Sequence, residues 1–187
     1  MTEKEKMLSG ALYDSSDIEL TKERLKAKKL CFEFNQLVPE KVEEKKNLIK
    51  KLFNKTGQNF LIEQQFSCDY GYNIEIGENF YSNHNLVILD CAKVTFGDNV
   101  FLGPNCAFYT AEHPLDFKTR NSGLEYAKPI KVGSNVWIGG SVTVLAGVTI
   151  GDNCVIGAGS VVTKDVPQNS VAVGNPCRVI KNIENNT

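Results

Sequence analysis

From residue 130 onward the chain repeats every six residues, and few folds accommodate that period. Aliphatic residues occupy one column of the repeat, and a second, mostly aliphatic column precedes it by two positions. The first column is Val132, Ile138, Val144, Ile150, Ile156 and Val162, and the second is Ile130, Val136, Val142, Val148, Cys154 and Ser160. A period of six matches neither the 3.6-residue helical turn nor the two-residue alternation of a strand. It predicts a mainly β chain, wound as a coil of short strands in which each turn buries its aliphatic side chains against the next.

The same motif recurs less regularly upstream, at residues 74–79, 94–99 and 101–105, so we expect the coil to begin near residue 60. Glycine follows four of the six first-column residues, where a turn needs either a left-handed backbone or the absence of a side chain. Residues 110–129 interrupt the repeat with polar and charged residues, one histidine and two prolines. A projecting loop is expected there, and such loops on a regular scaffold often carry functional residues.

The N-terminal part of the chain has a different pattern. Its apolar residues recur at intervals of three and four among lysines and glutamates, which predicts two or three amphipathic helices. Pro39 is expected between the second and third helices, and Thr56 with Gly57 is expected to end the last one. We therefore divide the chain into an N-terminal helical segment, residues 1–57, and a solenoid domain with a C-terminal tail, residues 58–187.

Composition restricts the class of protein. The 21 Lys and Arg residues nearly balance the 22 Asp and Glu residues, which argues against a nucleic-acid partner. The sequence contains no apolar run of membrane-spanning length, and its first residues are charged, so we expect no membrane association and a cytoplasmic location. Six cysteines are scattered without a C-x-x-C pair, which predicts buried, reduced thiols and neither a zinc site nor a disulfide framework.

Several stretches, some within the repeat and some outside it, carry a family resemblance. They are KMLSGALYD at 6–14, FSCDYGYNI at 66–74, NFYSNHN at 79–85, YTAEHPL at 109–115, NVWIGG at 135–140, GDNCVIGAGSVVTKDVP at 151–167 and VGNPCRVI at 173–180. In these the chain resembles the galactoside and maltose O-acetyltransferases, which are left-handed parallel β-helix enzymes. The resemblance implies transfer of an acetyl group from acetyl-CoA to a sugar hydroxyl, expected to be a 6-hydroxyl. It also implies homotrimers with active sites between subunits, and no metal.

A hydroxyl group attacks a thioester only when a base accepts its proton, and histidine suits that role near neutral pH. By the resemblance, His113 occupies the position of the catalytic base. Glu125, in the same loop, is a candidate to orient its ring, and a backbone carbonyl is the alternative. The backbone N–H of Gly140 is the expected donor to the developing oxyanion.

The resemblance also assigns binding residues. The acceptor sugar is expected to contact the N-terminal segment and the first turns of the coil, at Asp14, Arg24, Asp69, Tyr81, Asn83 and Cys91, with His84 as a neighbour. Asp69 matches the maltose type of the motif, whereas the galactoside type has serine there, so glucosyl sugars such as maltose are favoured. Coenzyme A is expected along the later turns, at Gly103, Trp137, Gly140, Ala158 and Thr163, with its phosphates near Lys164, Arg178 and Lys181.

Three alternatives remain open. A γ-type carbonic anhydrase uses the same coil but holds zinc with three histidines, and this chain has only His84 and His113. The coil could also serve as a scaffold without catalysis. Finally, an acetyltransferase of this type could act on serine or on a chloramphenicol-like alcohol in place of a sugar.

Overall fold

The computed structural model of the chain describes residues 1–184, so the end of the predicted tail lies outside it. Three helices precede the coil: α1 (Glu3–Ser9), α2 (Ile18–Gln36) and α3 (Val42–Leu52). A fourth, α4 (Phe117–Asn121), lies in the interruption of the repeat. The prediction of two or three N-terminal helices is confirmed, as is the position of Pro39 between α2 and α3.

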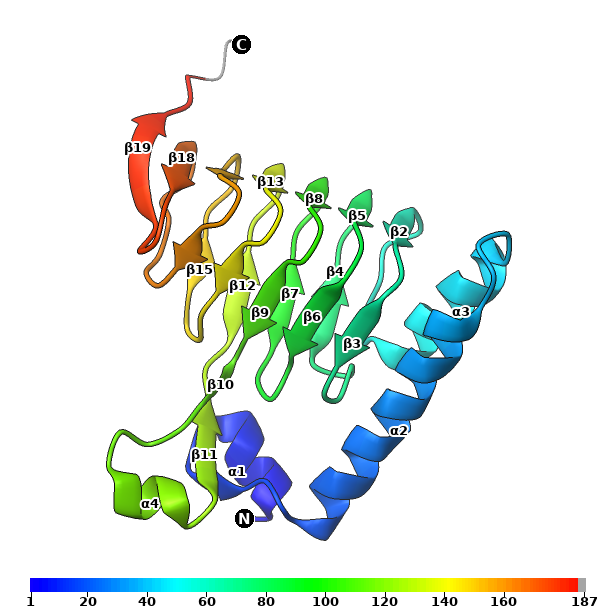
Figure 1. Cartoon of the computed structure of the whole chain (residues 1–187), viewed down its shortest axis with the longest axis vertical. Helices are drawn as coiled ribbons and strands as arrows, with labels where there is room; N and C mark the ends of the chain where they lie inside the picture. Colours follow the sequence, from blue (N-terminus) through cyan, green and yellow to red (C-terminus); the bar gives the residue numbers. More distant parts are fainter. Residues whose placement is uncertain (185–187) are drawn as a thin grey trace.

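The rest of the chain winds into a coil with three faces of stacked parallel strands (Figure 1). Face A contains β4 (Ile74–Ile76), β7 (Val94–Phe96), β12 (Ile130–Val132) and β15 (Thr149–Ile150). Face B contains β2 (Phe60–Ile62), β5 (Phe80–Ser82), β8 (Val100–Leu102), β13 (Val136–Ile138), β16 (Val155–Ile156) and β18 (Ser170–Val173), with β19 (Arg178–Asn182) antiparallel at its end. Face C contains β3 (Phe66–Cys68), β6 (Leu86–Leu89), β9 (Ala107–Tyr109), β14 (Thr143–Val144) and β17 (Val161–Val162). Each turn visits faces A, B and C in order, which confirms the predicted β-helix.

Both columns of the repeat point into the coil. In β13, for example, Val136 and Ile138 are fully buried while Trp137 between them is exposed. The residues paired with them on the preceding turn, Val100 and Leu102 on β8, are buried in the same way. Stacked turns therefore share one continuous apolar core, which no single turn could form.

The turns between faces A and B explain the glycines and asparagines of the repeat. Asparagines adopt the left-handed backbone conformation there, with φ of 55 to 58° at Asn79, Asn99, Asn135, Asn153 and Asn169. The preceding glycines serve a different purpose, because a Cβ atom on Gly133 would lie 2.2 Å from Asp152 Oδ1 and 2.8 Å from the Asp152 nitrogen. Close stacking of turns, and not a left-handed backbone, therefore requires glycine at this position.

The helical segment packs against the first turns of the coil (Figure 1). Phe34 of α2 and Phe53, which follows α3, contact the ring of Phe66 edge-on, with centroids 6.4 and 5.5 Å apart. The Asn35 side chain donates to the Phe66 carbonyl at 2.8 Å and accepts from its N–H at 2.9 Å. Apolar side chains of α2 and α3 thus join the solenoid core.

The prediction that Thr56 and Gly57 end the last helix is wrong. Helix α3 ends at Leu52, because Phe53 takes an extended conformation that buries its ring, and the Asn54 N–H already bonds the Ile74 carbonyl. Gly57 lies in the first turn of the coil, where a Cβ atom would approach the Gly77 carbonyl oxygen to 2.5 Å. Its glycine reflects close stacking of turns, not a helix stop.

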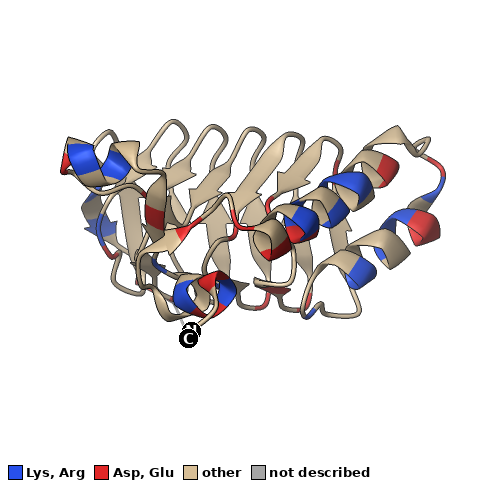
Figure 2. Cartoon of the chain, turned by 90° about the horizontal axis from the view of Figure 1, so that it is seen from below, with Lys and Arg blue, Asp and Glu red and all other residues tan. Residues whose placement is uncertain are grey.

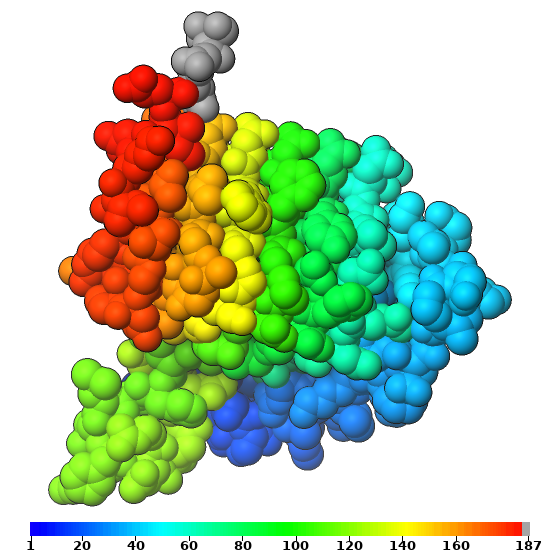
Figure 3. Space-filling view, turned by 45° about the horizontal axis from the view of Figure 1, so that its top comes forward, coloured from blue at the N-terminus to red at the C-terminus, as the bar shows by residue number. Residues whose placement is uncertain are grey.

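The interruption of the repeat forms an ordered projection. Strands β10 (Ala111–Glu112) and β11 (Leu124–Ala127) pair antiparallel, and β11 also pairs with β1 (Tyr13–Asp14) of the N-terminal segment. The projection leaves the coil between faces C and A and extends well beyond it (Figure 3). Segments about 110 residues apart in sequence thus share one small sheet.

Charged residues are distributed unevenly between the helices, the projection and the coil. Lys, Arg, Asp and Glu are concentrated on the helices and the projection, and the strands carry few of them (Figure 2). Among residues 1–184, no helix combines the length and apolarity needed to cross a membrane. All six cysteines are buried with free thiols, as predicted.

Candidate active site

His113 and Glu125 face each other on the projection. The register of the β10–β11 hairpin pairs Glu112 with Tyr126, so the next residues, His113 and Glu125, are opposite one another. His113 Nε2 lies 3.9 Å from Glu125 Oε2, within ion-pair range but beyond a hydrogen bond. The His113 side chain is 57% exposed, whereas that of Glu125 is 14% exposed. The arrangement presents an accessible imidazole backed by a largely buried carboxylate.

Tyr13 contacts the other carboxylate oxygen of Glu125. Strand pairing places the two residues directly across from each other, and the Tyr13 hydroxyl donates a hydrogen bond to Glu125 Oε1. Tyr13 is fully buried, and burial raises the pKa of its hydroxyl, which therefore stays a neutral donor. Sequence reasoning did not single out Tyr13, although it lies in the KMLSGALYD stretch that carries the family resemblance.

A polar cluster lies at the same edge of the coil, where faces C and A meet. It contains Arg24, whose guanidinium donates to the Tyr70 hydroxyl at 2.7 Å and to the Ser15 carbonyl at 2.6 Å. Cys91 Sγ lies 3.7 Å from Asp69 Oδ2, and burial raises the pKa of the Asp69 carboxyl. Three predicted acceptor residues, Arg24, Asp69 and Cys91, therefore meet here.

Asp14 adjoins this cluster through strand β1, next to Tyr13. Its carboxylate accepts from the Ser16 hydroxyl at 2.7 Å and from the Ser16 N–H at 2.8 Å. Both bonds lower the pKa of Asp14, and the bond from the Ser16 hydroxyl has the larger effect. The group is therefore a carboxylate at neutral pH. It can still accept hydrogen bonds, because a carboxylate offers more lone pairs than Ser16 uses.

Asp90 is a buried residue that hydrogen-bonds the backbone of the polar cluster. It was not identified from the sequence. Its side chain is fully buried and accepts three backbone N–H groups, from Asp69 at 3.0 Å, Tyr70 at 2.9 Å and Gly71 at 2.7 Å. Burial raises the pKa of Asp90 to about 7 against the opposing effect of these donors. The residue fixes the main chain that carries Asp69, and a sequence pattern gives no signal for such a contact.

A second group of predicted residues lies on face B and on the edge between faces B and C. Tyr81, Phe101 and Trp137 are cross-strand neighbours on the outward side of face B. With Asn83, Leu102 and Gly103 they line an open hollow of about 430 Å³. Asn83 and Gly103 are stacked at the edge, since the Asn83 N–H bonds the Leu102 carbonyl at 3.0 Å.

Gly140 and Ala158 continue this edge on the next turns. The Gly140 carbonyl accepts from Gly159 N–H at 2.9 Å, which places the two turns in direct contact. Within residues 1–184, neither the Gly140 N–H nor the Ala158 N–H has a hydrogen-bond partner. Two main-chain donors are thus available along the edge predicted to hold coenzyme A.

The remaining predicted coenzyme A residues lie near the last turns. Thr163 and Lys164 directly follow β17, at the edge between faces C and A, and both are exposed. Arg178 and Lys181 lie on β19, also exposed, and Arg178 donates to the Cys177 carbonyl at 2.8 Å. The structure therefore does not gather all predicted coenzyme A residues at one edge of a single chain.

The two groups are on different sides of the molecule. His113 and the polar cluster lie where face C turns into face A, whereas Tyr81, Asn83, Gly103 and Trp137 belong to face B and its edge with face C (Figure 1). In one chain the two groups therefore occupy two different edges of the coil.

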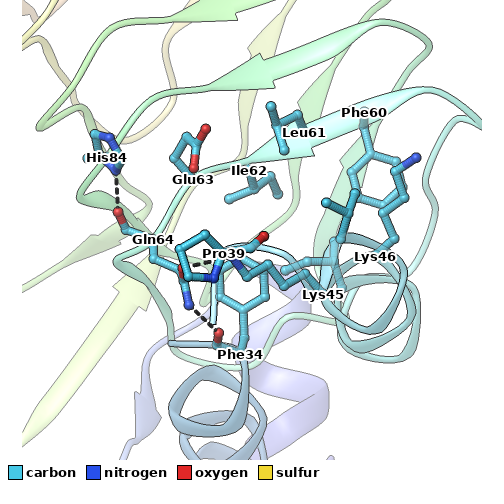
Figure 4. Close-up of a pocket in the computed structure, with 12 residues that line it drawn as sticks. Phe34, Pro39, Lys45, Lys46, Phe60, Leu61, Ile62, Glu63, Gln64 and His84 are labelled. Carbon is cyan, nitrogen blue, oxygen red and sulfur yellow. Dashed lines mark hydrogen bonds between the residues drawn. The ribbon is translucent and has the colours of Figure 1, made fainter. Parts of the chain in front are cut away.

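His84 belongs to a separate pocket of about 430 Å³, between the α2–α3 connection and the first turn of the coil (Figure 4). Its Nδ1 lies 2.6 Å from the Gln64 carbonyl oxygen, and the pocket floor is formed by apolar side chains that include Phe34, Phe60 and Ile62. Neither His113 nor Glu125 lines this pocket. In the part of the chain that the structure describes, no group of three His, Cys, Asp or Glu residues could hold a metal ion.

Two family models match the chain. Residues 6–57 match the maltose acetyltransferase hexapeptide capping motif, and residues 129–164 match six repeats of the bacterial transferase hexapeptide.

Solved structures extend the similarity over the whole chain. A maltose O-acetyltransferase from Clostridium difficile 630 is 56% identical with a TM-score of 0.98, covering 98% of each chain. A galactoside acetyltransferase in complex with coenzyme A is 47% identical with a TM-score of 0.95, covering 98% of this chain and 92% of the other. A hexapeptide-repeat acetyltransferase from Vibrio cholerae, complexed with acetyl coenzyme A, is 39% identical with a TM-score of 0.91, covering 99% of this chain and 100% of the other.

Proposed function

Because the chain belongs to the hexapeptide-repeat acetyltransferases that carry the maltose acetyltransferase capping motif, we propose that it O-acetylates a glucosyl sugar. The acceptor would be maltose, glucose or a related sugar, acetylated at its 6-hydroxyl. The observation that carries the proposal is the pairing of an exposed His113 with a largely buried Glu125, beside a cluster of polar side chains suited to bind sugar hydroxyls. Such a cluster offers the carboxylates and charged donors that bind vicinal hydroxyls.

In this proposal His113 accepts the proton of the attacking hydroxyl through the ring nitrogen that faces away from Glu125. The Glu125 carboxylate can stabilise the imidazolium that forms, because it carries the opposite charge and lies 3.9 Å from the ring nitrogen. The free Gly140 N–H is suited to stabilise negative charge that develops on the carbonyl oxygen under attack. No covalent intermediate on the protein is required.

The N-terminal segment, residues 1–57, acts in this proposal as a cap over the acceptor. Asp14 and Arg24 come from the cap, and Asp69 and Cys91 come from the coil below it. Arg24 is fixed by its bonds to Tyr70 and Ser15, so little entropy is lost when it binds a hydroxyl.

The chain's residues fit a coenzyme A donor. Bound acetyl-CoA would supply the acetyl group as a thioester. The unpartnered N–H groups of Gly140 and Ala158 can bind amide carbonyls of an extended arm, and Trp137 and Gly103 border the hollow beside them. Exposed Lys164, Arg178 and Lys181 can meet phosphates.

The separation of the two groups of residues favours an active site shared between copies of the chain. One copy would present His113 and its polar cluster, and its neighbour would present Asn83, Gly103 and Gly140. Face B carries an outward-facing row of residues in register, the exposed Leu61, Phe101 and Trp137 with the half-buried Tyr81, which a second copy can cover. We propose a cyclic homotrimer in the cytoplasm, a compartment in which free cysteine thiols stay reduced.

Release of free thiol from acetyl-CoA tests the acceptor class. We expect turnover with maltose and glucose, less with a thiogalactoside, and little with serine or chloramphenicol. Turnover only with serine or chloramphenicol would contradict the sugar assignment. Coenzyme A binding without turnover on any acceptor would do the same, and failure to bind coenzyme A would favour a scaffold.

A further inference from the structure

Tyr13 links the N-terminal cap to the loop that carries His113. Its ring is fully buried in a small apolar cluster, together with Met7, Leu20 and Ala127, apart from the main core of the coil. Helix α1, helix α2 and strand β11 each contribute to this cluster. The position of the Tyr13 hydroxyl is therefore fixed by packing from three directions.

The two oxygens of Glu125 have different partners. Oε1 accepts from the Tyr13 hydroxyl, and Oε2 is directed at His113 Nε2. Within residues 1–184, Tyr13 is the only hydrogen-bond donor to this side chain. A glutamate has three rotatable side-chain bonds, so without that donor its carboxylate would be free to turn away from the imidazole.

We propose that Tyr13 is a positioning residue for catalysis, which holds the Glu125 carboxylate toward His113. The inference rests on the proposed role of His113 as the base. It also gives the cap a second role, because strand β1 both borders the acceptor cluster and orders the catalytic loop through the Tyr13 and Glu125 pair.

The chain supplies a matched control for this hydrogen bond. Tyr72 also packs against the small cluster, and its hydroxyl donates to a glutamate of the cap, Glu23, at 2.7 Å. Neither Tyr72 nor Glu23 contacts His113 or Glu125 through any described hydrogen bond or ion pair of residues 1–184. Tyr72→Phe therefore removes an equivalent Tyr–Glu bond that does not face the imidazole.

The test compares steady-state kinetics with maltose for wild type, Tyr13→Phe, Tyr72→Phe, Glu125→Gln and the double variant Tyr13→Phe/Glu125→Gln. We expect Tyr13→Phe to lower kcat about tenfold or more, since misplacing a catalytic group by a fraction of an ångström is costly. Its KM for acetyl-CoA should not change, and Tyr72→Phe should keep the wild-type kcat. The double variant should be no slower than Glu125→Gln alone, because Tyr13 acts through Glu125.

A wild-type kcat for Tyr13→Phe would overturn the inference, and so would losses that multiply in the double variant. His113→Ala separates this failure from that of the proposed function: if it stays active, His113 is not the base, and if it is inactive while Tyr13→Phe is normal, only the role of Tyr13 fails. Should Tyr13→Phe not fold, as judged by thermal unfolding, Glu125→Asp replaces it. Shortening that side chain withdraws the carboxylate from both partners, so a wild-type kcat would again contradict the inference.

Discussion

His113 and Glu125 face each other across the β10–β11 hairpin, with Nε2 and Oε2 3.9 Å apart, and the hairpin is anchored by β1 of the N-terminal segment. This relationship joins the coil, the projection and the cap into one candidate site. If His113 is the base, replacing it should lower kcat. Replacing a residue at the edge between faces B and C should remove a different part of the site.

Replacing His113 by asparagine keeps a polar side chain of similar size but removes the base. We expect kcat to fall about 10²- to 10⁴-fold, the usual contribution of a general base. Coenzyme A affinity, measured by calorimetry, should stay at the wild-type value because His113 acts on the acceptor hydroxyl in this proposal, while other residues, Gly103, Trp137 and Gly140 among them, bind coenzyme A. A kcat within a factor of about three of wild type would show that another group accepts the proton.

Mixing two inactive variants tests whether active sites lie between copies. His113→Ala disables the projection, and Asn83→Ala disables the edge between faces B and C. After joint unfolding and refolding, random cyclic trimers should recover about a quarter of wild-type activity if each site takes His113 from one copy and Asn83 from another. No recovery, with both variants confirmed as trimers, would mean that one chain supplies both residues.

The buried carboxyl of Asp90 should make stability depend on pH. Burial raises its pKa from 3.8 to about 7, so the folded state binds a proton more tightly than the unfolded state. The contribution of Asp90 to the unfolding free energy should therefore decrease as pH rises from about 4 to about 7 and then level off.

Asp90→Asn removes this ionisation and is the matching variant. It gives up some acceptor capacity toward the three backbone N–H groups, so it should be less stable than wild type at about pH 5. The unfolding free energy of Asp90→Asn relative to that of wild type should increase by about 3 kcal/mol between about pH 5 and about pH 8. Urea unfolding at the two pH values measures this, and a constant difference would show that Asp90 is ionised throughout.

Close stacking of turns predicts the effect of a single methyl group at Gly133. Its Cβ atom would meet both the side chain and the backbone nitrogen of Asp152. We expect Gly133→Ala to lower the unfolding free energy by about 1–3 kcal/mol. Adding Asp152→Ala should recover little of it, because the backbone contact at 2.8 Å remains. Full recovery would indicate that only the side chains conflict.

The sequence predicted the fold well because the solenoid is built from local, repeated contacts. Each inward aliphatic of the six-residue period meets the equivalent residue three repeats along the chain, as Ile138 pairs with Ile156, so these contacts can be read from the repeat itself. The end of α3 was wrongly predicted, because Phe53 is withdrawn from the helix by packing on Phe66, a contact that the local pattern does not contain.

The candidate site was predictable only in part. The family resemblance named His113 and Glu125, and their assigned roles stay predictions. Tyr13 and Asp90 escaped notice because their importance depends on contacts with residues far along the chain or on burial beneath a turn. Asn83 and Gly103 lie at a different edge of the coil from His113, and this could be recognised only once the order of the three faces was known.

The most direct test of the account is to identify the product. The protein would be incubated with maltose and acetyl-CoA labelled with ¹³C in the acetyl group, and the products would be followed by NMR. We predict one labelled ester on a 6-hydroxyl of the sugar, formed by wild type and absent with His113→Asn. Labelled acetate without any sugar ester, or an ester that forms equally well with His113→Asn, would contradict the account.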